Sequence, residues 1–307
     1  MKTLFIVNPA AGHGRGDDRW SAAQARALAA FPGSEAWKTE RAGHASELAR
    51  RGLERGFEAL VAVGGDGTIG EVVDGFLSAP ASLRGKALLG VWPAGSGCDL
   101  ARHLRIGAEP ESMLALLAKP AVRRLDAGSL DFAGPDGKTM RKYFLNVVSL
   151  GLGGEVGRRI AATGKAWGGT LSYMAISLAC LARAKPYPMT LVIDGVEAPE
   201  ASYHLIAVAN TSTTGGGMRI APRADAQDGK LDFVAVGDLS RLQLFGRFPL
   251  IYSGGHLGTS GVTHRLISRL EVRSKAPVYL NIDGEAMGAL PAVFEALPGA
   301  VPFLCLD

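Results

Sequence analysis

The stretch Leu60-Val61-Ala62-Val63-Gly64-Gly65-Asp66-Gly67-Thr68 decides how the rest of the chain is interpreted. Its apolar first half predicts a buried parallel strand, and helical spacing begins after Thr68. The glycines therefore occupy a strand-to-helix turn, where positive φ angles and unpaired N–H groups favour a bound phosphate. Asp66 beside that phosphate indicates a cation between the two, or a proton taken from a nucleophile, and both belong to phosphoryl transfer. A plain Gly-Asp turn is the alternative.

Two further glycine-rich turns also follow apolar stretches. Asn8-Pro9-Ala10-Ala11-Gly12 follows the run that ends at Val7, and Pro93-Ala94-Gly95-Ser96-Gly97 follows the run that ends at Trp92. Strands and helices alternate through residues 1–122, which predicts a doubly wound α/β domain that binds a nucleotide. Ligands of such folds bind at the carboxyl ends of the strands, so we expect the turns to flank one nucleotide.

The pattern changes near Lys119-Pro120. From Arg123 onward, stretches rich in β-branched and aromatic residues alternate with turn signals, which predicts a β-rich, mostly antiparallel domain over residues 123–290. We expect residues 291–307 to form a tail that returns to the first domain. Strands are predicted at residues 143–148, 190–193, 203–209, 231–236, 270–272 and 278–282. Helical insertions are predicted at residues 166–183 and 239–252.

Composition indicates an ordinary globular protein with two sizeable cores. Of its 307 residues, 47% are hydrophobic and 20% are charged, and the net charge is +4. The arginines are scattered, which argues against a nucleic acid partner and suits an anionic substrate or membrane surface. The three cysteines, Cys98, Cys180 and Cys305, have no paired spacing, so we expect a reducing, cytoplasmic location.

No apolar run reaches the ~20 residues that a membrane-spanning helix needs. The first run is stopped by Asn8-Pro9 and is too short for a signal peptide. Contact with a membrane is therefore expected to be peripheral. Basic residues that flank the predicted helix 166–183 are candidates for that contact, with a solvated charged face as the alternative. They are Arg158, Arg159, Lys165, Arg183 and Lys185.

The ordered set of motifs resembles the catalytic domain of the diacylglycerol kinase family, which also includes sphingosine and ceramide kinases and bacterial lipid kinases. The resemblance is carried by the three glycine turns, the last continuing to Arg102, and by later segments. These are residues 146–151, 215–222, 225–232 and 283–285, so the match covers nearly the whole chain. It implies ATP and Mg²⁺ as cofactors and transfer of the γ-phosphate to a lipid alcohol such as diacylglycerol, which gives phosphatidic acid.

Carried over residue by residue, the resemblance implies several groups of functional residues. ATP is expected at Asn8, Pro9, Ala10, Ala11, Gly12, Thr39, Gly64, Gly65, Asp66, Gly67, Thr68 and Ser96. A network around catalytic Mg²⁺, partly through water, is implied at Asp66, Asp99 and Asp126. A structural Mg²⁺ is implied at Asp225, Asp228 and the backbone carbonyl of Lys230. Glu285 is implied as the proton acceptor, with Asp66 as the second catalytic residue.

The residues alone leave structural alternatives open for these acids. Asp99 stands where a helix cap is expected, and Asp126 and the Asp225–Lys230 segment are typical of turns. Glu285 is typical of a hairpin. Cys98 and Gly70 stand where the family usually has asparagine, which leaves catalytic efficiency and substrate choice open.

Two rival functions also stay open. The pentapeptide Gly64–Thr68 is similar to NAD kinases as well, and a catalytically silent lipid- or nucleotide-binding regulator is the second rival. The six histidines have no i, i+4 pair, so we predict no chemistry for them. Regulation, the identity of the lipid and the oligomeric state are left open, with a homodimer among the options.

Overall fold

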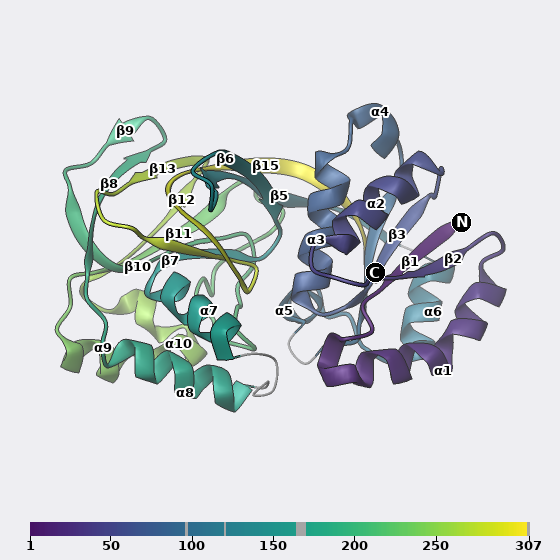
Figure 1. Ribbon diagram of the computed structural model, residues 1–307, viewed down its shortest axis with the longest axis horizontal. Helices are drawn as coiled ribbons and strands as arrows, with labels where there is room; N and C mark the ends of the chain where they lie inside the picture. The colour runs from purple at the N-terminus through teal and green to yellow at the C-terminus, as the bar shows by residue number, and fades with distance from the viewer. Residues whose placement is uncertain (96–97, 120, 164–169, 306–307) are drawn as a thin grey trace. The chain divides into compact units, whose positions relative to one another are not determined.

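The computed structural model describes residues 1–95, 98–119, 121–163 and 170–305. The chain divides into two compact units, Met1–Leu125 with Gly299–Asp307, and Asp126–Pro298. Two strands, β5 (Ala121–Ala133) and β15 (Glu285–Cys305), carry the chain from one unit to the other. The path of the chain is drawn in Figure 1.

The first unit is built on a parallel sheet. Its strands are β1 (Thr3–Val7), β2 (Glu35–Lys38), β3 (Ala59–Gly64) and β4 (Leu88–Pro93), and the end of β15 pairs with β4. The order is β15-β4-β3-β1-β2, with every neighbouring pair parallel. All residues of β1 and β3 are buried, as expected for strands covered on both faces. The predicted α/β fold is confirmed.

Helices cover both faces of this sheet (Figure 1). They are α1 (Arg15–Ala30), α2 (His44–Glu54), α3 (Asp66–Ser78), α4 (Ala81–Arg84), α5 (Asp99–His103) and α6 (Pro110–Ala118). Gly75 lets α3 approach α2 closely, because a Cβ there would lie 2.3 Å from the backbone oxygen of Ser46. Trp20 of α1 packs on Phe5 and Trp92, with ring centroids 4.8 Å and 5.2 Å away.

The second unit is an antiparallel β structure that closes on itself. Beside β5 and β15, its strands are β6 (Thr139–Phe144), β7 (Val147–Gly151), β8 (Tyr187–Ile193), β9 (Val196–Glu197), β10 (Ala201–Ala209), β11 (Leu231–Gly237), β12 (Val262–Ile267), β13 (Arg269–Arg273) and β14 (Tyr279–Ile282). A ring of antiparallel pairings runs β10-β7-β14-β15-β13-β8 and returns to β10. The prediction of a β-rich, mostly antiparallel second part is confirmed.

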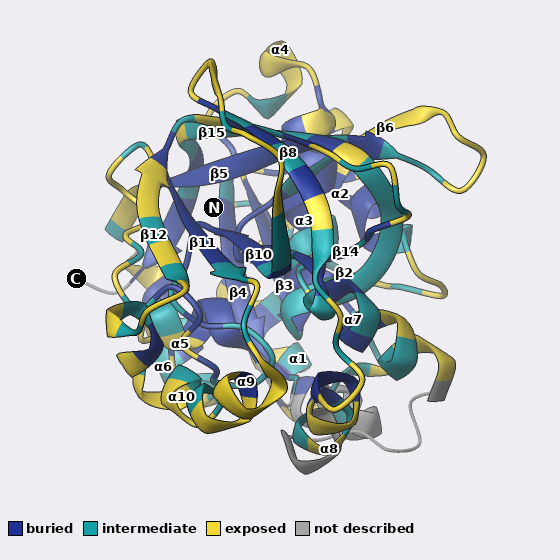
Figure 2. Ribbon diagram, turned by 90° about the vertical axis from the view of Figure 1, so that its left-hand side faces the viewer, coloured by how far each residue is buried: buried dark blue, intermediate teal, exposed yellow. Residues whose placement is uncertain are grey.

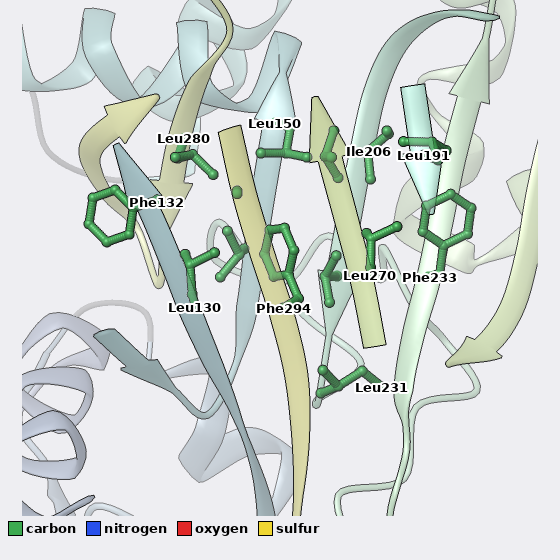
Figure 3. Close-up of a cluster of buried hydrophobic side chains, with 14 of the residues drawn as sticks. Leu130, Phe132, Leu150, Leu191, Ile206, Leu231, Phe233, Leu270, Leu280 and Phe294 are labelled. Atoms are coloured by element: carbon green, nitrogen blue, oxygen red, sulfur yellow. The ribbon is translucent and has the colours of Figure 1, made fainter. Parts of the chain in front are cut away.

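Large apolar side chains fill the inside of this β structure (Figure 3). Phe132, Leu150, Ile206, Leu270 and Phe294 come from five different strands and are all at most 1% exposed. Burial of one such side chain stabilises a fold by about 1.5–3 kcal/mol. The second unit therefore has a core of its own.

The described residues of the second unit contain several α-helices. They are α7 (Leu152–Thr163), α8 (Thr170–Leu181), α9 (Arg241–Arg247) and α10 (Leu250–Ser253). Both Figure 1 and Figure 2 show α8, α9 and α10 gathered along one side of the β structure. Within the described ranges, no helix combines the length and the apolar character that crossing a bilayer requires.

Two predicted elements were wrong in detail. The helix predicted at residues 239–252 is divided into α9 and α10, because Pro249 has no N–H with which to continue the helix. The strand predicted at residues 143–148 is divided into β6 and β7, because the backbone N–H groups of Leu145 and Asn146 donate to the Asp283 carboxylate instead of to a strand. The predicted helix at residues 166–183 is confirmed where it is described, as α8.

Candidate functional site

The three glycine turns meet at one edge of the parallel sheet. Each follows the carboxyl end of a strand, and those strands are neighbours. Backbone bonds join the turns, because Asn8 N donates to Val63 O at 2.9 Å and both Ala94 N and Gly95 N donate to Gly64 O. Parallel strands bring their carboxyl ends together, which is why turns far apart in sequence form one surface.

Glycine residues, which have no side chain, let these turns lie in contact. A Cβ on Gly95 would lie 2.5 Å from the Cα of Gly65, and a Cβ on Gly12 would lie 2.7 Å from the backbone oxygen of Ala94. Gly12 also has a φ of +58°, which favours glycine. The glycines are therefore required for the packing of the three turns, and the structure does not support a set of unrelated surface turns.

Asn8 fastens the first turn to the second. Its side-chain amide donates to the Thr68 hydroxyl at 2.9 Å, and its carbonyl oxygen accepts the N–H of Ala10 at 3.0 Å. Thr68 is only 5% exposed. Thr39 adjoins the same edge, since its N–H donates to Val7 O at 2.8 Å. The structure thus brings together the predicted ATP residues of the first two turns and Thr39. Ser96, the predicted ATP residue of the third turn, lies outside the described residues.

The Asp66 carboxylate joins the turn before α3 to the start of α5. It accepts the N–H of Asp99 at 2.9 Å and the N–H of Leu100 at 3.2 Å. Burial raises the pKa of Asp66, and the nearby Asp99 carboxylate adds to that rise. Asp99 itself forms an ion pair with Arg102. Asp99 is therefore not the cap suggested as an alternative, because Asp66 binds the first N–H groups of α5 in its place.

Cys98 holds the third turn against the second. Its Sγ lies 3.4 Å from Gly64 O in hydrogen-bonding geometry, and its backbone has a φ of +47°. Burial raises the pKa of this thiol to about 11, so it stays neutral near pH 7. A buried neutral thiol is a structural group and not a nucleophile. The residue that replaces the family's usual asparagine thus still links two turns.

In the second unit, Asp126 lies against the Asp225–Lys230 segment. It is 2% exposed, its carboxylate accepts the N–H of Gly229 at 2.6 Å, and its own N–H donates to Ala226 O at 2.7 Å. Asp126 belongs to strand β5, so its interpretation as a turn residue was wrong. Its carboxylate orders the segment that carries the predicted structural metal ligands.

The Asp225–Lys230 segment is a pair of side-chain-stabilised turns. The Asp225 carboxylate accepts the N–H of Gln227 at 3.0 Å, and the Asp228 carboxylate accepts the N–H of Lys230 at 2.9 Å. Among the described residues, no group of three or more His, Cys, Asp or Glu side chains is arranged to hold a metal. The proposed set has two carboxylates and one backbone carbonyl, so the Mg²⁺ site stays a prediction.

Glu285 follows a two-residue hairpin turn between β14 and β15. Ile282 pairs with Glu285, and the turn residues Asp283 and Gly284 have φ angles of +47° and +95°. The Asp283 carboxylate accepts the N–H groups of Leu145, Asn146 and Val147 at 2.9–3.3 Å. This bonding fixes the tip of the hairpin and therefore the backbone that carries Glu285.

Asn210 is a site residue that the sequence did not reveal. Its amide group donates to the carbonyls of Asp126 and Leu145 at 2.9 Å and 3.0 Å. Its Oδ1 is buried and has no hydrogen-bond partner in the described part of the chain. Asn210 thus ties Asp126 to the segment that holds the Glu285 hairpin, but its neighbours in sequence contain no recognisable motif for this role.

Comparison with known proteins identifies the two parts of the chain. Residues 2–130 match the diacylglycerol kinase catalytic domain, and residues 146–305 match the YegS C-terminal NAD kinase beta sandwich-like domain. A diacylglycerol kinase of Mycobacterium tuberculosis is 28% identical, over 99% of this chain and 94% of that protein. A Chromohalobacter salexigens protein named "Probable lipid kinase YegS-like" is 30% identical, over 86% and 80%. The chain belongs to this lipid kinase family.

Solved structures agree with the family's fold. A Bacillus anthracis protein has a TM-score of 0.78 at 24% identity and covers 100% of this lipid kinase and 95% of its own chain. An NAD kinase of Archaeoglobus fulgidus in complex with ATP has a TM-score of 0.50 at 17% identity, covering 99% and 93%. The similarity to the NAD kinase is one of fold alone. The prediction of a diacylglycerol kinase-type lipid kinase is confirmed at the level of the family.

The second unit of the lipid kinase contains an apolar pocket. It has a volume of about 120 Å³ and lies between β strands and the inner faces of α7, α8, α9 and α10. Val147, Leu181, Leu205, Phe248 and Ile251 are among the apolar residues that line it. Polar residues such as Ser149, Ser177 and Arg247 also line it, and the ring of another, His256, is fixed by a 3.0 Å bond to Ile220 O. The mainly apolar lining suits a segment of hydrocarbon more than a nucleotide, although the volume is below that of a pocket that encloses a whole drug-sized ligand.

Proposed function

We propose that this lipid kinase transfers the γ-phosphate of ATP to the hydroxyl of diacylglycerol, giving phosphatidic acid for phospholipid synthesis. The observation that carries the proposal is the pocket of the second unit, whose mainly apolar lining suits part of an acyl chain more than a dinucleotide. The choice of diacylglycerol is supported by the Mycobacterium tuberculosis relative, which is named a diacylglycerol kinase and matches 99% of this chain at 28% identity.

The three joined turns supply the phosphate end of the reaction. We assign ATP to the loops at Asn8–Gly12 and Gly64–Thr68, with Thr39 and Ser96 beside them. The start of α3 at Asp66 presents N–H groups and a positive helix end to phosphate oxygens. Asn8 and Cys98 hold the loops in fixed positions, so binding requires little rearrangement.

The acids of the first unit fit a cation. The Asp99 carboxylate lies close enough to Asp66 to raise the pKa of Asp66, and Mg²⁺ would relieve the repulsion between the two. When bound, Mg²⁺ would neutralise charge on the phosphates during transfer. We assign the catalytic ion to Asp66 and Asp99 and, from the family resemblance alone, to Asp126 of the second unit. A second, structural ion is assigned to Asp225, Asp228 and the carbonyl of Lys230.

Glu285 is assigned as the base. The lipid hydroxyl loses its proton to the Glu285 carboxylate as its oxygen bonds to the γ-phosphorus. The bond between that phosphorus and the β,γ-bridging oxygen breaks, and ADP leaves with the electron pair. The fixed hairpin tip supports this role, because a base must be held within hydrogen-bond reach of the proton that it takes.

The assignment is tested with radiolabelled ATP and a set of acceptors in Mg²⁺ or in chelator. The set contains diacylglycerol, sphingosine, ceramide and NAD. We expect label in phosphatidic acid alone, dependent on Mg²⁺. Preferential label in another lipid would overturn the choice of diacylglycerol, and label in NADP would overturn the lipid acceptor. ATP binding without any product would favour a regulatory protein. We also propose that the enzyme works in the cytoplasm at a membrane surface.

A further inference from the structure

We propose that the exposed faces of α9 and α10 dock this enzyme on an anionic lipid bilayer. The inference rests on the proposed lipid substrate and names the surface through which that substrate is reached. Four large apolar side chains define this docking patch, namely Leu242, Phe245, Leu250 and Tyr252. They are 86%, 39%, 36% and 36% exposed and fall within eleven consecutive residues. Clustered apolar exposure of this kind marks a contact surface, whereas isolated exposed apolar residues are ordinary.

The same two helices are apolar on their inner side. Leu244, Phe248 and Ile251 line the pocket, while their neighbours in the docking patch point away from it. A helix at the surface of a globular protein normally turns charged and polar residues outward. Figure 2 shows α9 and α10 exposed beside α8, whose Leu178 is also 36% exposed. The outer side of α9 and α10 instead presents the four apolar side chains of the docking patch to solvent, beside the exposed Arg241 and Gln243.

Charge selects a bilayer as the occupant. Residues 239–253, which contain α9 and α10, include Arg241 and Arg247 but no acid, although Asp238 directly precedes this stretch. Arg247 lines the pocket and donates to the Ser260 hydroxyl at 2.9 Å. Arg241, at the start of α9, is exposed, and so are Arg183 and Lys185 just after α8. Cations beside an apolar patch favour an anionic lipid surface. A second copy of the chain would bring the same cations face to face, which disfavours a symmetric dimer through this patch.

This docking patch differs from the cationic surface predicted around Arg158 and Arg159. Both arginines are paired with Glu155, and Arg158 also stacks over the Tyr279 ring at 3.9 Å. They are thus engaged within the protein. Lys165, from the same prediction, lies outside the described residues. We assign the contact instead to the exposed apolar residues of α9 and α10, and, of the predicted cations, Arg183 and Lys185 are retained as its charged neighbours.

Docking by this patch also explains how the substrate reaches the pocket. The helices that would lie in the lipid interface are the helices that wall the pocket. A lipid could then move from the bilayer past α9 and α10 without its chains crossing water, which would be unfavourable at about 25 cal/mol per Å² of apolar surface. Tyr252 is of a residue type that is enriched at membrane interfaces, and Leu242 and Phe245 are typical of the apolar face of an interfacial helix.

The test is co-sedimentation with phosphatidylcholine vesicles that contain or lack phosphatidylglycerol. The variants are Leu242→Glu and the double variant with Phe245→Glu. The matched control is Val196→Glu, because Val196 on β9 is 72% exposed and lies outside the docking patch. We expect the wild type and Val196→Glu to bind the anionic vesicles equally. Binding of the double variant should fall by about 10-fold or more, since two apolar groups lose their burial and two repelling charges are added.

Turnover separates this inference from the proposed function. On a short-chain diacylglycerol dispersed as single molecules, all variants should match the wild type. Patch-dependent vesicle binding with no lipid turnover would leave the docking surface standing and overturn the function. Vesicle binding that is equal in the wild type and the double variant would overturn the docking surface. The docking surface would also be overturned if the wild type were a dimer and the double variant were a monomer that binds vesicles as well as the wild type does.

A second measurement does not depend on adding charge. Phe245→Trp places a fluorophore in the docking patch, and Val196→Trp places one outside it. Brominated acyl chains should quench the added fluorescence of Phe245→Trp and leave that of Val196→Trp unchanged. Equal quenching of both, or quenching of neither, would overturn the docking surface.

Discussion

The Asp66 carboxylate accepts the backbone N–H of Asp99 at 2.9 Å, across 33 positions of sequence. This bond and the one to Leu100 place a negative charge at the start of α5 and a second acid beside it. The arrangement stabilises the helix start and raises the pKa of Asp66 through burial. Burial of the Asp66 charge is therefore unfavourable for folding, whereas the proposed reaction needs that charge.

Asp66→Asn separates the two roles. The amide keeps an acceptor oxygen for one backbone N–H and removes the buried charge, so the melting temperature should stay near that of the wild type. The value of kcat should fall by at least 10²- to 10³-fold, because a charge that faces Mg²⁺ is lost. Steady-state kinetics and thermal unfolding check both effects. Retention of most of the wild-type kcat would contradict the catalytic assignment.

Glu285→Gln tests the base. We expect kcat to fall by about 10²-fold or more with the KM for ATP unchanged, because the amide cannot take the proton. Asp283→Asn is the companion variant, since it weakens the bonds to Leu145, Asn146 and Val147 that fix the hairpin. Asp283→Asn should lower kcat less than Glu285→Gln does. The rise of the rate with pH, which reports loss of a proton by the base, should also stay in place in Asp283→Asn. Loss of ATP binding at normal kcat in Glu285→Gln would make Glu285 a binding residue.

The double change Asp225→Ala with Asp228→Ala tests the structural ion. Wild-type protein should gain thermal stability when Mg²⁺ is added, because an ion bound only by the folded state stabilises it. The double variant should lose that gain and some activity. Each change also removes one side-chain bond to a backbone N–H, so stability without Mg²⁺ should fall by about 1–2 kcal/mol. If Mg²⁺ raised the thermal stability of both proteins equally, the segment would be a pair of turns that binds no ion.

Much of the first unit could be predicted from local patterns. Apolar runs that end in glycine turns identify parallel strands, and the topology of parallel strands then brings Gly12, Gly65 and Gly95 together. The bonds that set the site do not follow from local pattern. Asn8 reaches Thr68 and Asp66 reaches Asp99 only after folding, because each pair is far apart in sequence.

The second unit shows why some elements were missed. Helix α7 contains Gly153, Gly154 and Gly157, which lower helix propensity. The structure explains them, because a Cβ on Gly154 would lie 2.0 Å from Tyr279 O and one on Gly157 would lie 2.9 Å from the Asn281 amide. Close packing against β14 thus outweighs local preference. Strand β15 was missed for a related reason, since Pro291, Pro298 and Pro302 argue against a strand in sequence.

His256 provides a test of stability against pH. It is 5% exposed beside the apolar pocket, and burial lowers its pKa below the usual value near 6.5, helped by the nearby His264. A histidine whose pKa is lower in the folded state binds protons more readily when unfolded. Its contribution to stability is therefore complete above about pH 6.5 and is lost as the pH falls below that value.

The His256→Gln variant isolates this contribution. Glutamine can keep a donor near Ile220 O, where the ring nitrogen now lies at 3.0 Å, but it does not titrate. The free energy of unfolding of the wild type should fall by up to about 1.4 kcal/mol more per pH unit than that of the variant below pH 6.5. Other acids, including Asp232 with its raised pKa, act alike in both proteins and cancel in the difference. Urea unfolding at several pH values gives the comparison, and parallel curves would show that His256 does not resist protonation in the folded state.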